Sequence, residues 1–330
     1  MEVLAHHGSN SNPDLYLAEN LLELDGEITA VFWRNPHPRL MLTILGDDNE
    51  EIDWELEMQG SVNSLGRQGL SADFVRVGDQ VRAAGVVSRR DPTSIGLLHL
   101  LLPSGEELVN GNRETRWSDE RFAATPRTFD PSAVSAAEES AEGIFRVWSG
   151  RLGPRPRPEE YSGLLTEHGR ELAAQYYALT DNTELECRTG IPTHMFDPVP
   201  MEITDGGDRV HIRTQEYDVR RVVYLTEDLP EPVPSNVGFS TGHWEGDTLV
   251  VETTHVAWSY FDPYGTPQSD QMSYVETFRV SDDGSQLSYT IVATDPVMFT
   301  SPIELDRGWR WQPGTEMVAY DCIAEWERSE

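Results

Sequence analysis

The chain has 330 residues, room for two domains of common size, and it carries 25 Lys and Arg against 57 Asp and Glu, a net charge of −32. Because such a charge repels phosphate backbones, we expect no nucleic-acid partner. No apolar run approaches the roughly 18 residues of a membrane-spanning helix, so we expect no such helix either.

Residues 1–21 are predicted to form an N-terminal segment that precedes the folded units. In the opening "MEVLAHHGSN", the tripeptide "VLA" resembles the end of a secretory signal, where small side chains lie near the cleavage point. No basic region and no long apolar region precede it. Two interpretations remain: a clipped signal that ends at Ala5, or a chance apolar tripeptide on a cytosolic protein.

Residues 22–111 are predicted to form a small OB-like β-barrel. A strand, the turn "NPHP" and a second strand occupy residues 22–45, and "IDWELEMQG" supplies a third strand. The triplet "VGD" at 77–79 then leads into another strand, and "GLLHLLLPSGEELV" adds two more. Five or six short antiparallel strands within about 90 residues are typical of an OB-type barrel.

Residues 112–160 are rich in Pro, Ser, Ala and charge, and they are predicted to form an extended linker. A helix is expected over residues 164–179, with Thr166 as its N-cap. From about residue 191 onward, alternating runs separated by glycine-containing turns predict about eight antiparallel strands. Residues 161–330 should therefore form a closed or nearly closed, lipocalin-like antiparallel β-barrel, with a curved sandwich as the alternative. The whole chain is predicted to be mainly β with few helices, which excludes Rossmann and TIM architectures.

The strongest hairpin signal lies in "GFSTGHWEGDTLVVETTHVAW", residues 238–258. Glycine takes positive φ without steric cost and aspartate bonds its own backbone in turns, so Gly246 and Asp247 are predicted to form the turn. The alternating run "TLVVETT" then predicts a strand. The hairpin should place Trp244 and Glu245 at the rim of the barrel.

Several segments resemble an uncharacterised family of exported bacterial proteins. In the first unit, "AHHGS" at 5–9, "NPH" at 35–37 and "VGD" at 77–79 stand where that family has "AHHS", "NPH" and "PGD". The second unit resembles a domain that accompanies it, whose marks include "GHSIGHWEGDTLVVDT". The corresponding segments here are "CRTGIPTHM" (187–195), "GFSTGHWEGDTLVVET" (238–253), "PQS" (267–269), "ETF" (276–278), "DP" (295–296) and "YDCIAE" (320–325).

This chain departs from the family pattern at three positions. Gln268 stands where a histidine is usual, Phe239 replaces another, and Thr277 replaces an arginine. The resemblance implies export, hence a periplasmic or secreted protein, and it implies no particular reaction. Export favours the clipped-signal interpretation of the N-terminus.

The two cysteines, Cys187 and Cys322, can be interpreted in two ways. In an exported protein an even pair predicts one disulfide, and closing a loop of well over 100 residues would contribute roughly 4 kcal/mol. The alternative is a pair of buried free thiols. No Cys-x-x-Cys pair exists, which excludes a zinc ribbon and a thioredoxin-type site.

The N-terminal histidines suggest one candidate metal site. Cleavage after Ala5 would leave His6 as the first residue, whose amine and imidazole could bind copper, with His7 beside it and His37 as a further ligand. The alternative is an exposed terminus, with His37 packed in a turn. Sequence motifs for NAD, ATP and serine-hydrolase chemistry are absent, so we expect no other cofactor.

The second candidate site is the interior of the second barrel. Strand 210–217 places His211, Arg213, Gln215 and Tyr217 on one face and Val210, Ile212, Thr214 and Glu216 on the other, and one of these faces must point inward. A buried glutamate there could act as general acid or base, and an arginine could hold a carboxylate or an enolate. The predicted catalytic residues are Glu216, His243, Arg220 and Glu245; the predicted ligand-binding residues are His211, Arg213, Tyr217, Trp244, Trp258, Tyr260, Asp262 and Glu276.

These residues support two function classes. The first is binding of a small, largely apolar molecule with a carbonyl or carboxylate, with cofactor-free turnover by an isomerase, cyclase or lyase. The second is a non-catalytic accessory or binding protein, or a periplasmic copper-binding protein. A structural ion pair between Glu216 and Arg220 is the simpler explanation for those two residues.

Overall fold

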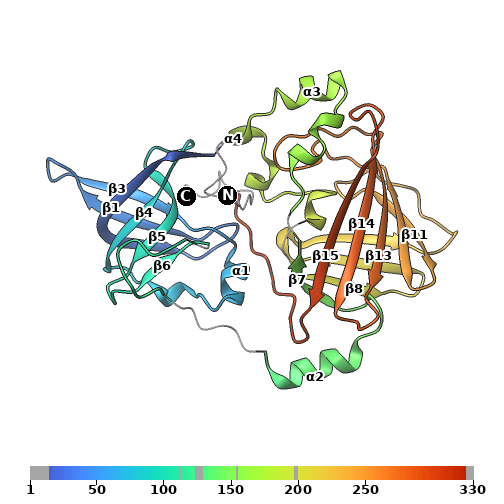
Figure 1. Cartoon of the computed structure of the whole chain (residues 1–330), viewed down its shortest axis with the longest axis horizontal. Coiled ribbons are helices and arrows are strands. Elements are labelled where there is room, and N and C mark those ends of the chain that lie inside the picture. Colours follow the sequence, from blue (N-terminus) through green and yellow to red (C-terminus); the bar gives the residue numbers. More distant parts are fainter. Residues whose placement is uncertain (1–14, 112, 123–128, 154, 197–199, 325–330) are drawn as a thin grey trace. The chain divides into compact units, whose positions relative to one another are not determined.

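The computed structural model describes residues 15–111, 113–122, 129–153, 155–196 and 200–324 (Figure 1). The described residues separate into two compact units, one formed by those within 1–128 and 321–330 and the other by those within 129–320. Each unit is a β-barrel with its own apolar core. The predicted fold class, mainly β with two successive barrels and few helices, is confirmed.

The first unit has the connectivity of an OB fold. In the described residues its strands are β1 (Tyr16–Phe32), β2 (Arg39–Leu45), β3 (Glu51–Glu57), β4 (Gln80–Ser88), β5 (Ser94–Leu101) and β6 (Glu107–Val109). They follow the order β3-β2-β1-β4-β5-β6, and a parallel pairing of β3 with β5 closes a small barrel. The segment between β3 and β4 holds helix α1 (Val62–Arg67), capped by Ser61, and a 3-10 turn at Ala72–Phe74.

Strand β1 is long because it serves both halves of this barrel. Its residues 27–32 pair with β2, whereas residues 16–17 and 21–27 pair with β4. At Gly26, next to the point where the partner changes, an added Cβ would lie 2.4 Å from the carbonyl oxygen of Thr43. The close approach of the two backbones therefore requires glycine.

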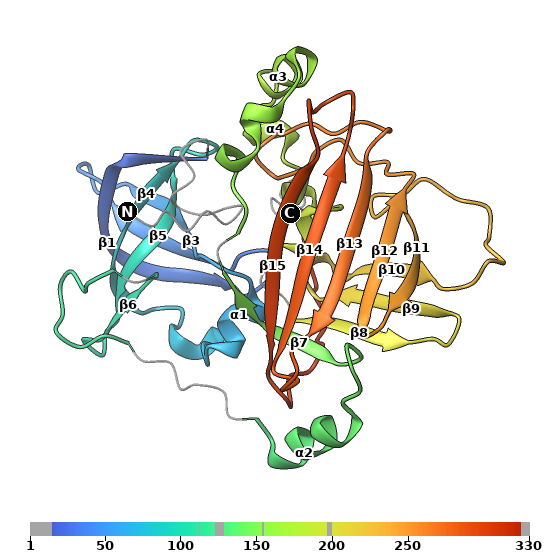
Figure 2. The same cartoon turned by 45° about the vertical axis from the view of Figure 1, so that its right-hand side comes forward.

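The second unit is a larger barrel (Figure 2). Its strands in the described residues are β7 (Val147–Leu152), β8 (Met201–Asp205), β9 (Arg209–Thr214), β10 (Val219–Tyr224), β11 (Phe239–Glu245), β12 (Thr248–Thr254), β13 (Ser273–Val280), β14 (Gln286–Thr294) and β15 (Ile303–Trp311). The barrel closes in the order β10-β11-β12-β13-β14-β15-β7-β8-β9. β7 comes from the segment predicted as a linker.

One strand pair differs from the predicted antiparallel pattern. β10 and β11 run parallel and pair only through Val223 with Ser240 and Tyr224 with Thr241. The connection 225–238 is long enough to return the chain to the end of the barrel where β10 began, which a tight hairpin turn cannot do. The remaining neighbours in the barrel are antiparallel.

The predicted hairpin of "WEGD" is confirmed. Glu245 pairs with Thr248, and Gly246 between them has φ +61°, the left-handed conformation that glycine adopts without strain. The run that follows forms β12, with Leu249, Val251 and Thr253 directed into the barrel.

The helices are short and lie mainly between β6 and β8. Besides α1, the described residues form α2 (Pro131–Ser140), α3 (Glu167–Ala173) and α4 (Ala178–Asp181). The predicted helix 164–179 is divided into α3 and the start of α4, and its predicted cap is confirmed because the Thr166 hydroxyl accepts a hydrogen bond from the Gly169 amide. Further 3-10 turns occur at Pro158–Glu160, Ser162–Leu164, Thr183–Glu186, Thr193–Met195 and Glu216–Asp218.

Cys187 and Cys322 form a disulfide, as one of the two interpretations predicted. Among the described helices, none has the length and apolar character that crossing a membrane requires.

Candidate functional sites

The strand predicted at 210–217 is shorter than expected, and its apolar face points inward. β9 ends at Thr214, and Glu216 and Tyr217 belong to a 3-10 turn in which Tyr217 has φ +56°. Val210 and Ile212 are buried in the barrel, whereas His211 is exposed. Burying the apolar face removes more hydrocarbon from water, which decides the orientation.

The four predicted catalytic residues therefore do not line the interior. His243 and Glu245 lie on the outer face of β11, where the imidazole Nε2 and the Glu245 carboxylate are 3.2 Å apart and both side chains are more than half exposed. Arg220 is exposed and pairs with Asp218 at 2.9 Å, not with Glu216. Glu216 is half-buried in the turn. The predicted acid–base chemistry requires these groups inside the barrel, so their positions do not support it.

Four of the predicted ligand-binding residues lie on the outer face or at the rim. Arg213 is half-buried and bonds Asp218 at 2.5 Å. Trp244 is 40% exposed, and its ring packs edge-on against Phe145. The other two are His211 and Tyr217.

Three further predicted residues share the connection between β12 and β13. Trp258 is buried beneath the guanidinium of Arg188, and Tyr260 packs edge-on against Tyr176. The buried Asp262 carboxylate accepts hydrogen bonds from the Tyr161 hydroxyl at 2.6 Å and from the backbone amides of Tyr264 and Thr266. The Asp262 carboxylate is thus occupied by donors from the chain itself, and together with the ring contacts it holds this loop in place.

Glu276 is the predicted residue that lies inside the second barrel. Its carboxylate is fully buried and pairs with the guanidinium of Arg221, which is 3% exposed. Arg221 Nη1 donates to Glu276 Oε1 at 2.9 Å and Nε to the Ser240 hydroxyl at 2.9 Å; a further donor reaches Thr253. The Tyr289 hydroxyl donates to Glu276 Oε1 at 2.7 Å. We call Arg221, Glu276, Ser240, Thr253 and Tyr289 the interior network.

The protonation states of the interior network are set by its burial and its pairing. Burial alone would raise the pKa of Glu276, but the charge of Arg221 and hydrogen bonds from Arg221 and Tyr289 outweigh it and lower that pKa. The nearby His194, itself buried, acts in the same direction. Burial raises the pKa of the Tyr289 phenol well above its usual value, and the Glu276 charge adds to this. At neutral pH the network thus holds a carboxylate and a protonated phenol.

Sequence reasoning missed Arg221 by one position. Arg221 alternates with the buried Val219 and Val223, whereas the predicted Arg220 belongs to the exposed face of β10. A shift of one residue reverses which face a strand residue occupies. The alternation of Val219, Arg221 and Val223 along the strand is the sequence signal that places Arg221 on the inner face.

Segments of the family resemblance meet near this interior. Gln268 Nε2 donates to the backbone oxygens of Ile191 and Tyr260, and the Tyr274 hydroxyl donates to Gln268 Oε1. Ser269 bonds the buried Asp295 carboxylate through its amide and its hydroxyl. These bonds join "CRTGIPTHM", "PQS" and "DP" into one structure.

The predicted copper site lies mostly outside the described residues, which do not include His6 and His7. His37 is buried, and its Nδ1 lies 2.6 Å from the Glu57 carboxylate, which also accepts from Arg90. Within the described residues no group of three or more His, Cys, Asp or Glu side chains is arranged to hold a metal.

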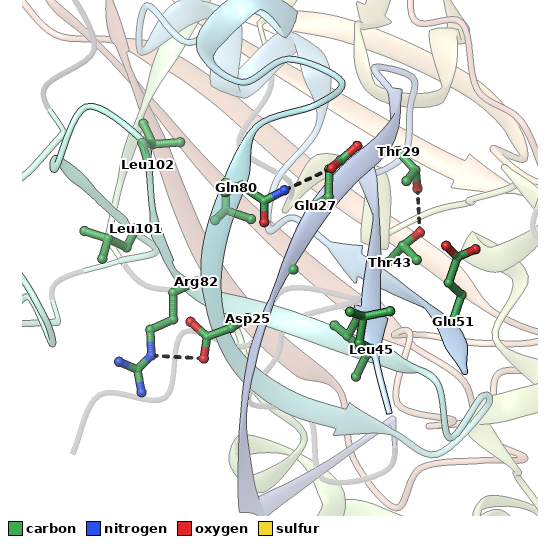
Figure 3. A pocket seen from close by; sticks show the side chains of 13 residues that line it. Asp25, Glu27, Thr29, Thr43, Leu45, Glu51, Gln80, Arg82, Leu101 and Leu102 are labelled. Atoms are coloured by element: carbon green, nitrogen blue, oxygen red, sulfur yellow. Dashed lines mark hydrogen bonds and ion pairs between the residues drawn. The ribbon is translucent and has the colours of Figure 1, made fainter. Parts of the chain in front are cut away.

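A pocket of about 790 Å³ lies on the first barrel, and sequence reasoning did not find it (Figure 3). It lies beside the point where β1 leaves β2 and pairs with β4. The last residues of β2, Ile44 and Leu45, have no partner on β1 there. Its lining combines carboxylates, hydroxyls and leucines, namely Asp25, Gly26, Glu27, Thr29, Thr43, Ile44, Leu45, Glu51, Gln80, Val81, Arg82, Leu101 and Leu102.

Hydrogen bonds and an ion pair fix several polar groups of this pocket. Gln80 donates to the Glu27 carboxylate at 2.9 Å, and Thr43 donates to the Thr29 hydroxyl at 3.3 Å. Arg82 Nε lies 3.8 Å from the Asp25 carboxylate. Leucine side chains border these groups, and Leu45 is 68% exposed.

Comparison with known proteins adds one match. The model of a family of unknown function (DUF6152) matches residues 1–97, which hold β1 to β4 and the start of β5. This agrees with the resemblance of the first unit to an uncharacterised family. No significant match was found among curated proteins or among solved structures.

Proposed function

We propose that this protein is a non-catalytic small-molecule-binding protein whose site is the pocket of the first barrel. The observation that carries this proposal is the pocket itself. Its volume of about 790 Å³ falls within the range of roughly 300–1,000 Å³ that small-molecule sites occupy. Its lining pairs exposed hydrocarbon with fixed polar groups, the combination that orients an amphipathic ligand.

The chemistry of the lining favours binding over catalysis. The pocket residues include no histidine and no cysteine, the side chains that most often transfer protons or attack substrates near neutral pH. The accessory or binding class that the sequence left open is therefore preferred to an isomerase, cyclase or lyase at this site.

Replacing Leu45 with Ser tests the proposed site. A six-carbon probe series (hexylammonium, hexanol and hexanoate) is titrated into the full chain while amide resonances are followed by NMR. We expect at least one probe to shift the amides of residues 25–29 and 43–45 saturably. Leu45→Ser should weaken that probe about fivefold, because part of the apolar wall is lost.

Val77→Ser is the matched control, since Val77 is 65% exposed on the same unit and does not line the pocket. This variant should bind as the wild type does. The probes are titrated up to about 10 mM, a concentration that would reveal binding weaker than that of most specific ligands. If none of them produces a saturable shift at these amides, the proposed function is wrong.

The second candidate is a small-molecule site inside the second barrel, now built on the interior network and not on the catalytic residues predicted from the sequence. Glu276, a predicted ligand-binding residue, is buried there beside Arg221 and Tyr289, and an arginine and a phenol suit a carboxylate or carbonyl group. A lipocalin-like carrier or a cofactor-free isomerase would use this network in place of Glu216 and His243. It ranks second because apolar side chains, Val210 and Ile212 among them, fill the interior.

Tyr289→Phe tests this second candidate, because it removes one hydroxyl and keeps the ring. If the network binds carboxylates, decanoate should raise the thermal midpoint of the wild type by several degrees and that of the variant by much less. Tyr224→Phe, on the outer face of β10, is the control and should respond as the wild type does. An unchanged midpoint in every protein would dismiss the site.

A periplasmic or secreted location belongs to the same proposal. It is supported by the disulfide of Cys187 with Cys322, since disulfides persist in oxidising compartments and are rare in the cytosol. Copper at the N-terminus remains a proposal that the described residues do not address. Recovery of the native protein from the cytosolic fraction alone would contradict export.

A further inference from the structure

The charges around the first-barrel pocket are unequal. Three carboxylates, those of Asp25, Glu27 and Glu51, line it against the single guanidinium of Arg82. Arg82 is already engaged, because it pairs with Glu23 at 2.7 Å and contacts Asp25 at 3.8 Å. In the part of the chain that the structure describes, neither Glu27 nor Glu51 has an ion-pair partner. The pocket therefore offers uncompensated negative charge.

Hydrocarbon borders these carboxylates on two sides. In Figure 3, Leu101 and Leu102 lie to one side of Asp25 and Leu45 lies to the other. Leu45 is 68% exposed, so its side chain presents hydrocarbon at the edge of the pocket. A ligand in this pocket can therefore contact both an apolar wall and a carboxylate.

We propose that this pocket binds an organic cation, an ammonium or guanidinium group carried on a short aliphatic chain. The inference rests on the proposed function and names its ligand class. Charge complementarity with Glu27 and Glu51 selects the cationic head, and contact with Leu45 and Leu101 selects the chain. The net charge of −32 favours the approach of such a cation and opposes anions.

A bare metal ion fits this pocket less well than an organic cation. Calcium needs six to eight oxygen ligands at about 2.3–2.6 Å, hence carboxylates clustered around one point. No such cluster of three or more occurs in the described residues. An organic cation needs only one or two carboxylates near its head, and it also buries its hydrocarbon chain, which a metal ion does not have.

The ratio of affinities within the six-carbon series tests the charge. Hexylammonium should bind the full chain roughly tenfold more tightly than hexanol, and hexanoate should bind most weakly. Raising the NaCl concentration from about 50 to about 500 mM should weaken hexylammonium and leave hexanol unchanged, because salt screens the partly exposed carboxylates. Equal affinities of hexylammonium and hexanol would overturn this inference and leave the proposed binding function intact.

Charge-removing variants locate the head group. Glu27→Gln and Glu51→Gln should each lower hexylammonium affinity about threefold and leave hexanol affinity unchanged. Asp119→Asn is the matched control, an exposed carboxylate of the same unit outside the pocket. If Asp119→Asn weakens hexylammonium as much as Glu27→Gln does, the attraction comes from the overall charge and the site-specific inference is wrong. Saturable binding by none of the three probes would overturn both the inference and the proposed function.

Discussion

Replacing Glu276 with Gln should destabilise the second barrel by about 3–5 kcal/mol, a loss typical of removing one partner of a buried ion pair. The substitution keeps the shape of the side chain but leaves the Arg221 guanidinium charged in an interior where it is 3% exposed. Arg221 would keep its bonds to Ser240 and Thr253, which are neutral and cannot compensate the charge. Urea unfolding followed by tryptophan fluorescence measures the loss.

Two further variants separate the charge from general damage to the core. In Arg221→Met with Glu276→Leu, both charges are absent, so a substantial part of the lost stability should return. Glu252→Gln changes an exposed glutamate on β12 and should alter the free energy of unfolding by less than about 0.5 kcal/mol. A loss below about 1 kcal/mol for Glu276→Gln would show that water or a structural shift relieves the stranded charge.

The pH dependence of the same variant gives an independent check. The folded pKa of Glu276 lies below its usual value of 4.5, so its contribution to stability is present above the unfolded pKa and is lost as the pH falls through the folded pKa. The stability gap between wild type and Glu276→Gln should thus be largest at neutral pH and shrink below about pH 4.5. A gap that is constant with pH would contradict the ionised state of Glu276.

The alternation of apolar and polar residues along the strands predicts much of the fold and part of the interior network. It predicts the strands of both barrels, whereas turn and capping residues predict the Gly246 hairpin and the role of Thr166; each signal depends on residues close in sequence. Alternation does not fix where a strand ends. At Tyr217 the backbone enters the left-handed region, and no neighbouring glycine marks that turn. Glu216 therefore occupies a turn and not the strand position predicted for it.

The first-barrel pocket illustrates what local patterns cannot predict. It forms where β1 leaves β2 and pairs with β4, so its walls come from segments far apart in the sequence, such as Asp25, Leu45 and Leu101. Asp25 and Leu45 alone are ordinary exposed strand positions, and Leu101 is a half-buried one. Gly26 gives the one local hint, since a glycine inside an alternating strand often marks a close backbone approach.

Removing the disulfide should cost roughly 2–5 kcal/mol of stability. The bond between Cys187 and Cys322 closes a loop of well over 100 residues that contains β8 to β15. In the chain-entropy description it restricts the unfolded chain far more than the folded barrel, whose strands are already held by hydrogen bonds and a buried core. The effect should appear as a lower urea midpoint for Cys187→Ser with Cys322→Ser than for the oxidised wild type.

Thiol counts and reductant together show whether the bond itself is responsible. Denatured, non-reduced wild type should contain no free thiol, and two should appear after reduction, since the chain has two cysteines. Reductant should lower the wild-type midpoint to that of the double serine variant and leave the variant unchanged. A wild type that unfolds at the same midpoint with and without reductant would contradict the predicted stabilisation by the cross-link.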